Sequence, residues 1–195
     1  IASLSETLSS YMVDKDADSD VLAGLETISQ SSRGLIKFVE SYRNLTRVAA
    51  PVKKAFYVRE MIDRVIQLTA QQTREAGAVC TYLEKSDDIL LYADESQISQ
   101  ILINLIRNAC QAGANKVEIT AELDRSDSVF IHVTNNGRPI SKESREEIFV
   151  PFYTTKQEGT GIGLSLSRQI MRLHNGTLTL TRSDESGTVF TLYFK

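Results

Sequence analysis

The sequence predicts an α+β protein: a helical hairpin, which is half of a dimeric four-helix bundle, followed by a two-layer α/β sandwich. Apolar residues with helical spacing lie on both sides of a short polar segment at 14–18, which indicates two antiparallel helices. After Pro51 the pattern changes to helices mixed with short alternating strands, which is typical of one helical layer on one mixed sheet. We expect the hairpin at 1–48, a linker at 49–57 and the sandwich at 58–195.

In the hairpin, the two expected helices differ in length. Apolar residues keep a helical period from Ile1 to Met12, and a second pattern follows Asp18 or Ser19, each a suitable N-cap, for about 30 residues. Much of the second apolar stripe therefore has no partner within the chain. Either the first helix continues upstream, or the stripe pairs with a second chain in a four-helix bundle, or both. The alternative is that the long helix lies on the sandwich domain.

The sandwich elements follow from apolar periodicity, with Ala-Ala-Pro at 49–51 ending the long helix. The expected helices are 59–76, 94–112, 141–148 and 163–174. The expected strands are 56–58, 78–83, 89–92, 117–123, 129–134, 177–181 and 189–194. We expect 78–83 to pair with 89–92, and the last two strands to be joined by a turn around 184–187.

Composition and charge exclude several classes of protein. The 195 residues are 42% hydrophobic and 24% charged, as in an ordinary soluble domain, and the net charge of -3 gives no overall field that attracts nucleic acid. No long uncharged apolar run and no signal peptide are present, so a membrane would be reached only through segments upstream of Ile1. Cys80 and Cys110 lack metal-ligand spacing and indicate reduced core thiols, which favours a cytoplasmic protein.

Two asparagines mark the helix expected at 94–112. Asn104 and Asn108 are four residues apart, so they lie one above the other on one helix face. Asparagine is a poor residue inside a helix, because its amide competes for nearby backbone groups. The pair is either a set of solvated or capping amides, or two amide oxygens that face a ligand, one of them near a magnesium ion.

Three further motifs follow along the chain. Asn-Asn-Gly at 135–137 follows a strand and predicts a sharp turn. Gly-Thr-Gly-Ile-Gly-Leu at 159–164 opens a helix, where backbone N–H groups and the helix dipole attract phosphate; a hinge is the alternative. Gly-Thr at 187–188 precedes the last strand, where a hairpin turn is a sufficient explanation.

Taken in order, these motifs resemble those of the catalytic ATP-binding domain of sensor histidine kinases. The ordered set comprises Asn-x-x-x-Asn-Ala, Asn-Gly-x-x-Ile, Ile-Phe-x-Pro-Phe at 148–152, the glycine-rich segment and Gly-Thr. That fold is shared with DNA gyrase, heat-shock protein 90 and MutL. The resemblance covers about 56–195, and the segment 1–48 looks like the dimerisation and phosphotransfer hairpin of the same family.

The resemblance implies a role for individual residues. It makes Asn108 the magnesium ligand, and assigns catalytic roles to Asn104, beside the phosphates, and to Lys156, which reaches the terminal phosphate from the lid. The lid would be anchored by Phe149 and Phe152. The residues expected to contact ATP or ADP are Asn104, Arg107, Asn108, Gln111, Asn135, Gly137, Ile140, Lys156, Gly159, Thr160, Gly161, Ile162, Gly163, Leu164 and Thr188.

Within that set, the resemblance separates two ends of the nucleotide. Asn135 would meet the adenine amino group, while Ile140 lines the adenine pocket and Thr188 supports it. Glycines 159, 161 and 163 would hold the phosphates. Arg107 and Gln111 flank the metal ligand and are candidates for ligand contact, although Arg107 and Lys156 are equally interpretable as solvated surface charges.

Two departures from the family pattern stand out. Asn135 replaces the usual Asp, and Pro139 replaces a glycine, so the pocket loses a carboxylate and its lid entrance is stiffer. The phosphorylated histidine of the family is followed by an acidic residue on the first hairpin helix. The two histidines here, His132 in a strand and His174 at a helix end, lack that context, so we expect the acceptor upstream of Ile1 and the chain to be a fragment.

The resemblance implies the cytoplasmic kinase core of a bacterial two-component sensor. With Mg-ATP, the intact protein would pass the γ-phosphoryl group to a histidine and then to an aspartate of a response-regulator receiver domain. We expect a homodimer through the hairpin, no nucleic-acid partner, and no autophosphorylation by this fragment alone. The alternatives are a non-catalytic nucleotide-binding signalling module and a MutL-like clamp, but the short polar lid and the hairpin argue against the clamp.

Overall fold

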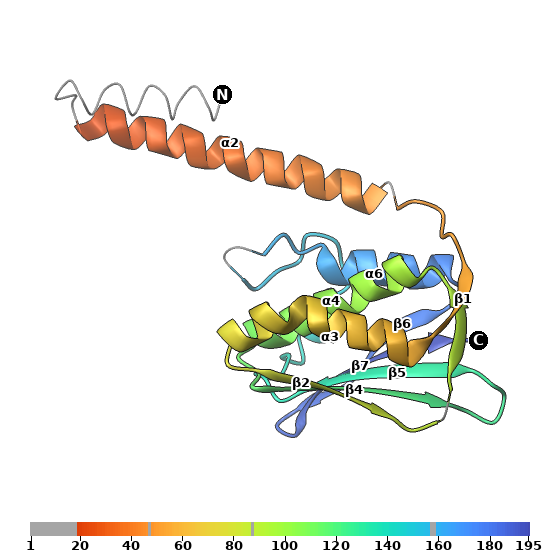
Figure 1. Cartoon of the computed structure of the whole chain (residues 1–195). Coiled ribbons are helices and arrows are strands. Elements are labelled where there is room, and N and C mark those ends of the chain that lie inside the picture. Colours follow the sequence, from red (N-terminus) through yellow and green to blue (C-terminus); the bar gives the residue numbers. More distant parts are fainter. Residues whose placement is uncertain (1–18, 47, 87, 157–158) are drawn as a thin grey trace. The chain divides into compact units, whose positions relative to one another are not determined.

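The chain divides into two compact units, and the second begins at Val48. The computed structural model describes residues 19–46, 48–86, 88–156 and 159–195. In the first unit it describes one helix, α2 (Ser19–Thr46), which matches the long helix expected after the polar segment (Figure 1). The first helix of the expected hairpin, at 1–12, and the possible N-cap Asp18 lie outside the described residues.

The second unit is a two-layer α/β sandwich, as expected. The longer helices of this unit pack on one face of a five-stranded mixed sheet, an arrangement that can be followed in Figure 1. The helices are α3 (Val58–Glu75), α4 (Glu95–Gln111) and α6 (Gly163–Leu173). The short helix α5 (Ser144–Glu147) lies between β5 and α6 in the sequence. The sheet has the order β2-β4-β5-β7-β6, formed by β2 (Val79–Glu84), β4 (Lys116–Leu123), β5 (Val129–Asn135), β7 (Gly187–Phe194) and β6 (Thr177–Asp184).

The predicted pairing of the strands at 78–83 and 89–92 is wrong. β2 pairs in parallel with β4, whereas β3 (Leu90–Ala93) pairs antiparallel with β1 (Lys54–Tyr57) in a separate two-stranded sheet. The polar segment between the two strands has the composition of a hairpin turn, but Lys85 N–H still donates to Ala121 O, which continues the pairing with β4. Ile89 is buried, and its carbonyl accepts from the first residue of α3, so the chain has crossed to the other sheet.

Strand β1 shows that the second unit begins earlier in the sequence than predicted. Residues 54–57 were expected to belong to a linker, but they pair with β3 and therefore form part of the compact second unit. Phe56 is the residue of this strand that faces the core. The remaining strands and helices of the second unit lie within a few residues of their expected ranges, including the turn between β6 and β7.

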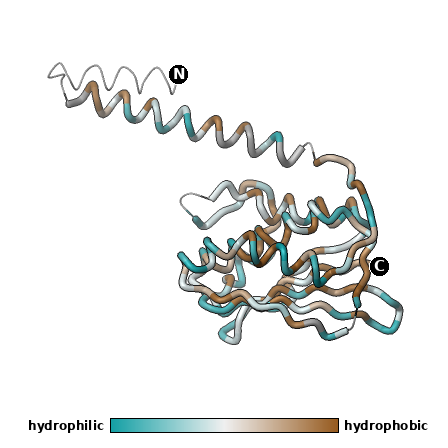
Figure 2. The backbone as a smooth tube through the Cα atoms, in the orientation of Figure 1, coloured by the Kyte–Doolittle hydropathy of each residue, from teal (hydrophilic) through white to brown (hydrophobic). Residues whose placement is uncertain are grey.

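Helix α4 is the central element of the core. Its apolar residues Ile98, Ile101, Leu102 and Leu105 are at most 2% exposed and lie between the neighbouring helices and the sheet. Figure 2 shows hydrophobic stretches both in the helical layer and in the sheet. Packing of this kind holds α4 in place, and with it every side chain that α4 presents to the site.

The start of α4 is fixed by a capping residue. Asp94 Oδ1 accepts hydrogen bonds from the backbone N–H groups of Ser96 and Gln97, at 3.1 and 3.2 Å, as a helix N-cap does. Its Oδ2 accepts from Val52 N–H at 2.8 Å, which ties the entering chain to this helix. Although burial opposes ionisation, the hydrogen bond donated by the Ser96 hydroxyl, together with these backbone hydrogen bonds, holds the pKa of Asp94 below its usual value.

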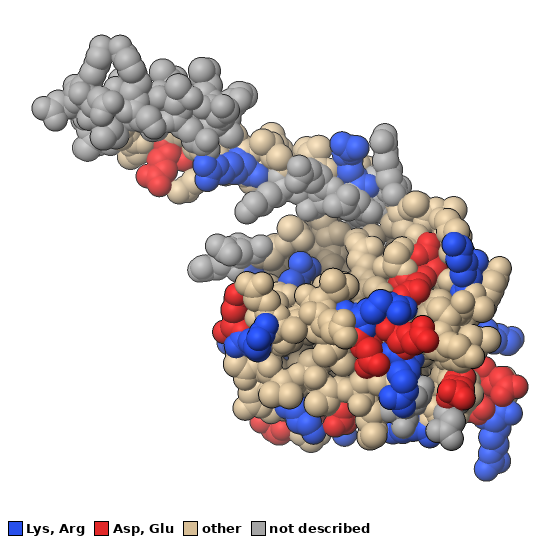
Figure 3. Space-filling model, in the orientation of Figure 1, with Lys and Arg blue, Asp and Glu red and all other residues tan. Residues whose placement is uncertain are grey.

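The surface and the helices add two observations. On the face seen in Figure 3, acidic and basic side chains of the second unit are interspersed. Within the described ranges, no helix has the length and the apolar character that crossing a membrane requires.

Candidate functional site

A cavity of about 610 Å³ opens beside α4, within the size range of small-molecule sites. It lies among α4, the start of α6, the end of β5, the start of β7 and the segment that connects β5 to α6. The structure brings together on its wall the predicted residues Asn104, Arg107, Asn108, Gln111, Asn135, Ile140, Lys156, Gly159, Thr160, Gly161, Gly163, Leu164 and Thr188.

Two predicted contact residues do not line the cavity. Gly137 N–H donates to Asn135 Oδ1 at 3.1 Å, and a Cβ added at Gly137 would lie 2.9 Å from the Ala112 side chain. Ile162 is 4% exposed and is the N-cap residue of α6. Gly137 therefore lets the turn after β5 approach the end of α4, and Ile162 anchors the start of α6; both support the wall from behind.

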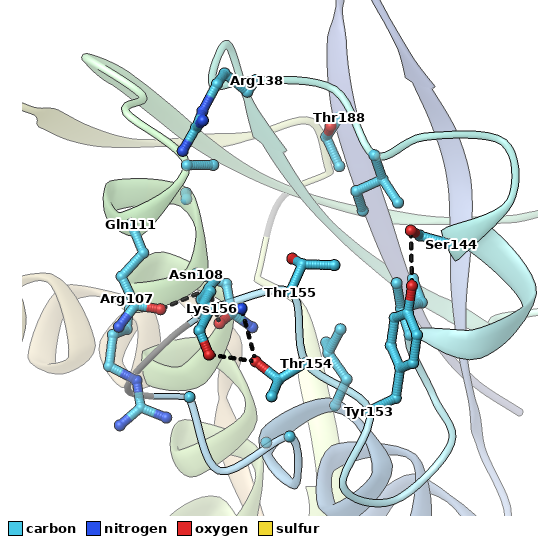
Figure 4. A pocket seen from close by; sticks show the side chains of 18 of the residues that line it. Arg107, Asn108, Gln111, Arg138, Ser144, Tyr153, Thr154, Thr155, Lys156 and Thr188 are labelled. Atoms are coloured by element: carbon cyan, nitrogen blue, oxygen red, sulfur yellow. Dashed lines mark hydrogen bonds between the residues drawn. The ribbon is translucent and has the colours of Figure 1, made fainter.

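Helix α4 presents two amide oxygens to one cation. Lys156 Nζ donates to Gln111 Oε1 at 2.6 Å and to Asn108 Oδ1 at 3.2 Å, and Figure 4 shows Lys156 reaching α4 from the opposite wall. Burial, and then the nearby positive charge of Arg107, lower the pKa of the Lys156 ammonium. Neutral amide oxygens that already hold a cation fit magnesium, which prefers oxygen ligands and uses few of them from the protein. Among the described residues, no cluster of three His, Cys, Asp or Glu offers another metal site.

Asn104 lies one helical turn before Asn108, and its side chain makes hydrogen bonds within the protein rather than to Lys156. Its side chain is 7% exposed; Nδ2 donates to Ser167 Oγ at 3.2 Å, and Oδ1 accepts from Arg107 Nη2 at 3.1 Å. Ser167 Oγ in turn donates to Gly163 O at 2.8 Å. A Cβ at Gly163 would lie 2.3 Å from Asn104 Oδ1, so only glycine allows this approach. Asn104 thus joins α4 to the first turn of α6 and orients Arg107.

The glycine-rich segment forms a tight entry into α6. Gly161 has φ +66°, and an added Cβ would lie 2.4 Å from the backbone of Phe152, whose N–H donates to Gly161 O at 2.9 Å. Gly159 packs equally closely on Thr154. The first N–H groups of a helix lack partners within the helix and carry partial positive charge. Arg107 and Lys156 also line the cavity, so this end of it is suited to anions.

The other end of the cavity is more enclosed and more apolar. Asn135 and Thr188 are partners in the β5–β7 register and are 6% and 3% exposed. Thr188 Oγ1 lies 2.7 Å from Ser183 Oγ, which accepts from Ile140 N–H at 2.8 Å. The wall is completed by the apolar residues Ala112, Ile140, Leu164 and Phe190. A planar apolar ring with polar edges fits such an end.

Gly187 has φ +127°, and a Cβ there would lie 2.6 Å from Asn135 O. The Gly-Thr motif therefore serves close packing beside the cavity as well as the hairpin turn.

The two expected lid anchors differ, and some wall residues were missed. Phe149 packs edge-on against Phe190, with ring centres 6.4 Å apart, whereas Phe152 is 37% exposed with φ +68°. Tyr153 OH donates to Ser144 Oγ at 2.8 Å, which closes one wall, as Figure 4 shows. The sequence carried no periodic or motif signal for these polar wall residues. The unpredicted polar wall residues are Arg138, Ser141, Ser144, Tyr153, Thr154 and Thr155.

Neither histidine lies in a position suited to accept phosphate. His174 Nε2 accepts from Asp94 N–H at 3.0 Å, and its Nδ1 lies 2.9 Å from Ile170 O, to which it must donate. His132 Nδ1 lies 2.9 Å from Thr191 Oγ1, and Nε2 lies 3.3 Å from Glu122 Oε1 on the open face of the sheet. Both rings are therefore held by their surroundings, away from the cavity wall.

Comparison with characterised proteins gives a consistent result. Residues 93–195 match the family described as histidine kinase-, DNA gyrase B- and HSP90-like ATPases. Sensor histidine kinase ZraS of Salmonella typhi is 28% identical over 170 residues, covering 86% of this chain and 37% of that protein. Sporulation kinase A of Bacillus subtilis is 31% identical over 145 residues, covering 73% and 24%. The chain thus spans well under half the length of these relatives.

Solved structures match both units. The nucleotide-free catalytic domain of histidine kinase ThkA is 35% identical, with a TM-score of 0.66, over 73% of this chain and 94% of that one. ThkA in complex with the response regulator protein TrrA matches 99% of this chain and 58% of that one, at 27% identity and a TM-score of 0.71. The chain therefore belongs to the histidine kinase-, DNA gyrase B- and HSP90-like ATPases and carries the ATP-binding domain of a bacterial sensor histidine kinase.

Proposed function

We propose that the cavity binds Mg-ATP with the phosphates at the start of α6 and the base at the β5–β7 end. The observation that carries this proposal is the polarity of one cavity: free helix N–H groups, Arg107 and Lys156 at one end, and an apolar enclosed wall with Asn135 and Thr188 at the other. A nucleotide has the same distribution of charge along its length. The volume of about 610 Å³ accommodates a ligand of that size.

Asn108 and Gln111 are the residues that would hold magnesium, because their side-chain oxygens already converge on a cation. When bound, the ion neutralises charge on the terminal phosphates. Arg107, held by Asn104, adds positive charge beside them. The chain's own contribution to phosphoryl transfer is then to position the terminal phosphate and to stabilise its charge, which is how such reactions are accelerated.

In the complete protein, we propose that the γ-phosphoryl group passes to a histidine outside the described residues and then to a receiver-domain aspartate. The rings of His132 and His174 already take part in hydrogen bonds, which supports a phosphate-accepting histidine elsewhere. The complex of ThkA with TrrA supports a response-regulator partner by analogy. The hydrogen bonds of these two histidines favour the alternative, a non-catalytic nucleotide-binding module, only if no phosphate-accepting histidine exists upstream.

We also propose a homodimer through the first unit. Val21, Ile28 and Leu35 are spaced seven residues apart on α2 and are 43%, 47% and 64% exposed. A stripe with this period is the seam of a helical bundle, and its side chains would be buried by a second copy.

Calorimetric titration with ADP, with and without magnesium, tests the nucleotide site. Asn108→Ala is expected to remove most of the magnesium-dependent part of the affinity, because alanine supplies no oxygen ligand. The fold should persist, since alanine favours the helix. Gln100→Ala, an exposed change on α4 away from the cavity, is the control and should behave as the parent chain. Unchanged magnesium dependence in Asn108→Ala would contradict the assignment.

A further inference from the structure

The orientation of the Asn135 side chain is fixed by its neighbour. Asn135 Oδ1 accepts from the backbone N–H of Gly137 at 3.1 Å. A backbone N–H can only donate, so the atom facing it must be the amide oxygen. The amide NH₂ is then the group that Asn135 presents at the cavity wall. In the described part of the chain this NH₂ has no hydrogen-bond acceptor.

The turn after β5 cannot easily release this orientation. Arg138 N–H donates to Ala112 O at 2.9 Å, and Asn136 Oδ1 accepts from the N–H groups of Asn115 and Lys116 at 3.1 and 3.0 Å. Gly137 itself is packed against the end of α4. Flipping the Asn135 amide would point its NH₂ at the Gly137 N–H, so two donors would face each other in a buried place.

An amide and a carboxylate at position 135 therefore recognise different bases. A carboxylate has two acceptor oxygens, one for Gly137 N–H and one for the 6-amino group of adenine. Asn135 offers the base a donor instead, which opposes a 6-amino group and pairs with a 6-oxo group. Sites that hydrogen-bond a substrate discriminate strongly, because a mismatched polar group is left unpaired.

We propose that Asn135 is a specificity-determining residue that makes this cavity favour 6-oxopurine nucleotides, those of hypoxanthine or guanine, over adenine nucleotides. Adenine nucleotides still bind through their phosphates but lose the hydrogen bond at this position. The inference rests on the proposed function, because it requires the base to lie at the β5–β7 end of the cavity.

The test compares ADP with IDP. Adenine carries a 6-amino group and hypoxanthine a 6-oxo group with a hydrogen on N1, whereas neither base has a substituent at position 2. Dissociation constants are measured with magnesium for the parent chain, for Asn135→Asp, and for Asn175→Asp, which makes the same change at an exposed residue after α6 that lies off the cavity wall. We expect the parent chain to bind IDP at least as tightly as ADP. Asn135→Asp should shift the ratio tenfold or more toward ADP, while Asn175→Asp leaves the ratio within twofold of the parent value.

Tighter binding of ADP than of IDP by the parent chain overturns this inference while leaving the proposed nucleotide site intact. A ratio that Asn135→Asp leaves unchanged also overturns it. Failure of both nucleotides to bind overturns the proposed function, and this inference with it. Because the parent comparison needs no variant, the proposal stays testable even if the buried carboxylate of Asn135→Asp disturbs folding.

Discussion

Replacing Lys156 by methionine is expected to strengthen divalent-metal binding to the nucleotide-free chain. The Lys156 ammonium lies on Gln111 Oε1 and Asn108 Oδ1, at 2.6 and 3.2 Å, and so occupies the oxygens that a metal would use. A metal ion must displace it before it can bind. Methionine keeps an unbranched chain of similar length but carries no charge and donates no hydrogen bond.

The size of the effect follows from the cost of that displacement. Hydrogen bonds from a charged donor contribute more than neutral ones, but Lys156 is only partly buried and still contacts solvent, which weakens such pairs. We take about 1 kcal/mol for the two bonds together. That free energy corresponds to about a fivefold excess of the lysine-bound form, so the metal meets free oxygens in roughly one molecule in six. Lys156→Met should therefore bind metal about six times more tightly.

Titration with Mn²⁺, followed by electron paramagnetic resonance, measures this affinity without nucleotide. Lys142→Met removes an exposed lysine of the same connecting segment that lies off the cavity wall, and should leave the affinity unchanged. The lowered pKa of Lys156 adds a pH signature: as pH rises toward that pKa the ammonium discharges, so metal binding tightens in the parent chain beyond any change seen in Lys156→Met. Equal or weaker metal binding by Lys156→Met would refute the competition.

Four further outcomes are expected. Ser167→Ala should cost about 1–3 kcal/mol in urea unfolding, because Asn104 Nδ2 is left buried without an acceptor; unchanged stability would contradict that role. In sedimentation, Leu35→Glu should weaken self-association while Gln30→Glu, on the opposite side of α2, does not. Incubation with labelled ATP should leave no acid-labile label on either histidine of this chain. Burial, and then Cys110, raise the pKa of Cys80 to about 11, so the contribution of Cys80 to the free energy of unfolding should be constant below pH 9 and fall from there toward about 11, and Cys80→Ala should reduce the loss of stability over that range.

Local pattern predicted the elements of the second unit well, because each depends on a few neighbouring residues. The apolar period of α4 and its capping Asp94 define both the helix and its start. The pairing of β2 and β3 was missed because the polar segment 85–88 has the composition of a turn in either topology. What decides between the topologies is non-local: the hydrogen bond of Lys85 to β4 and the burial of Ile89 beside α3.

The residues of the site likewise divide into those that local pattern predicted and those that it did not. Spacing singled out Asn108 and the glycine-rich segment, and the family resemblance made Gln111 a candidate for ligand contact; the structure brings them to one cavity. The wall formed by Tyr153 and Ser144 was not predicted, because a hydrogen bond between two loop residues nine positions apart has no periodicity to reveal it.

The two asparagines of α4 show how one spacing serves two purposes. Four residues correspond to about 40° of rotation around a helix, so Asn104 and Asn108 begin from nearly the same face. The difference comes from the neighbour each meets: at Asn104, Gly163 lets α6 approach so closely that the amide is enclosed, and its nitrogen and oxygen each have a hydrogen-bond partner. Asn108 lies one turn beyond the start of α6, where the cavity opens, and its oxygen stays available to a cation. The glycine on α6 therefore encloses Asn104 as a support of the site, while Asn108 is left facing the cavity.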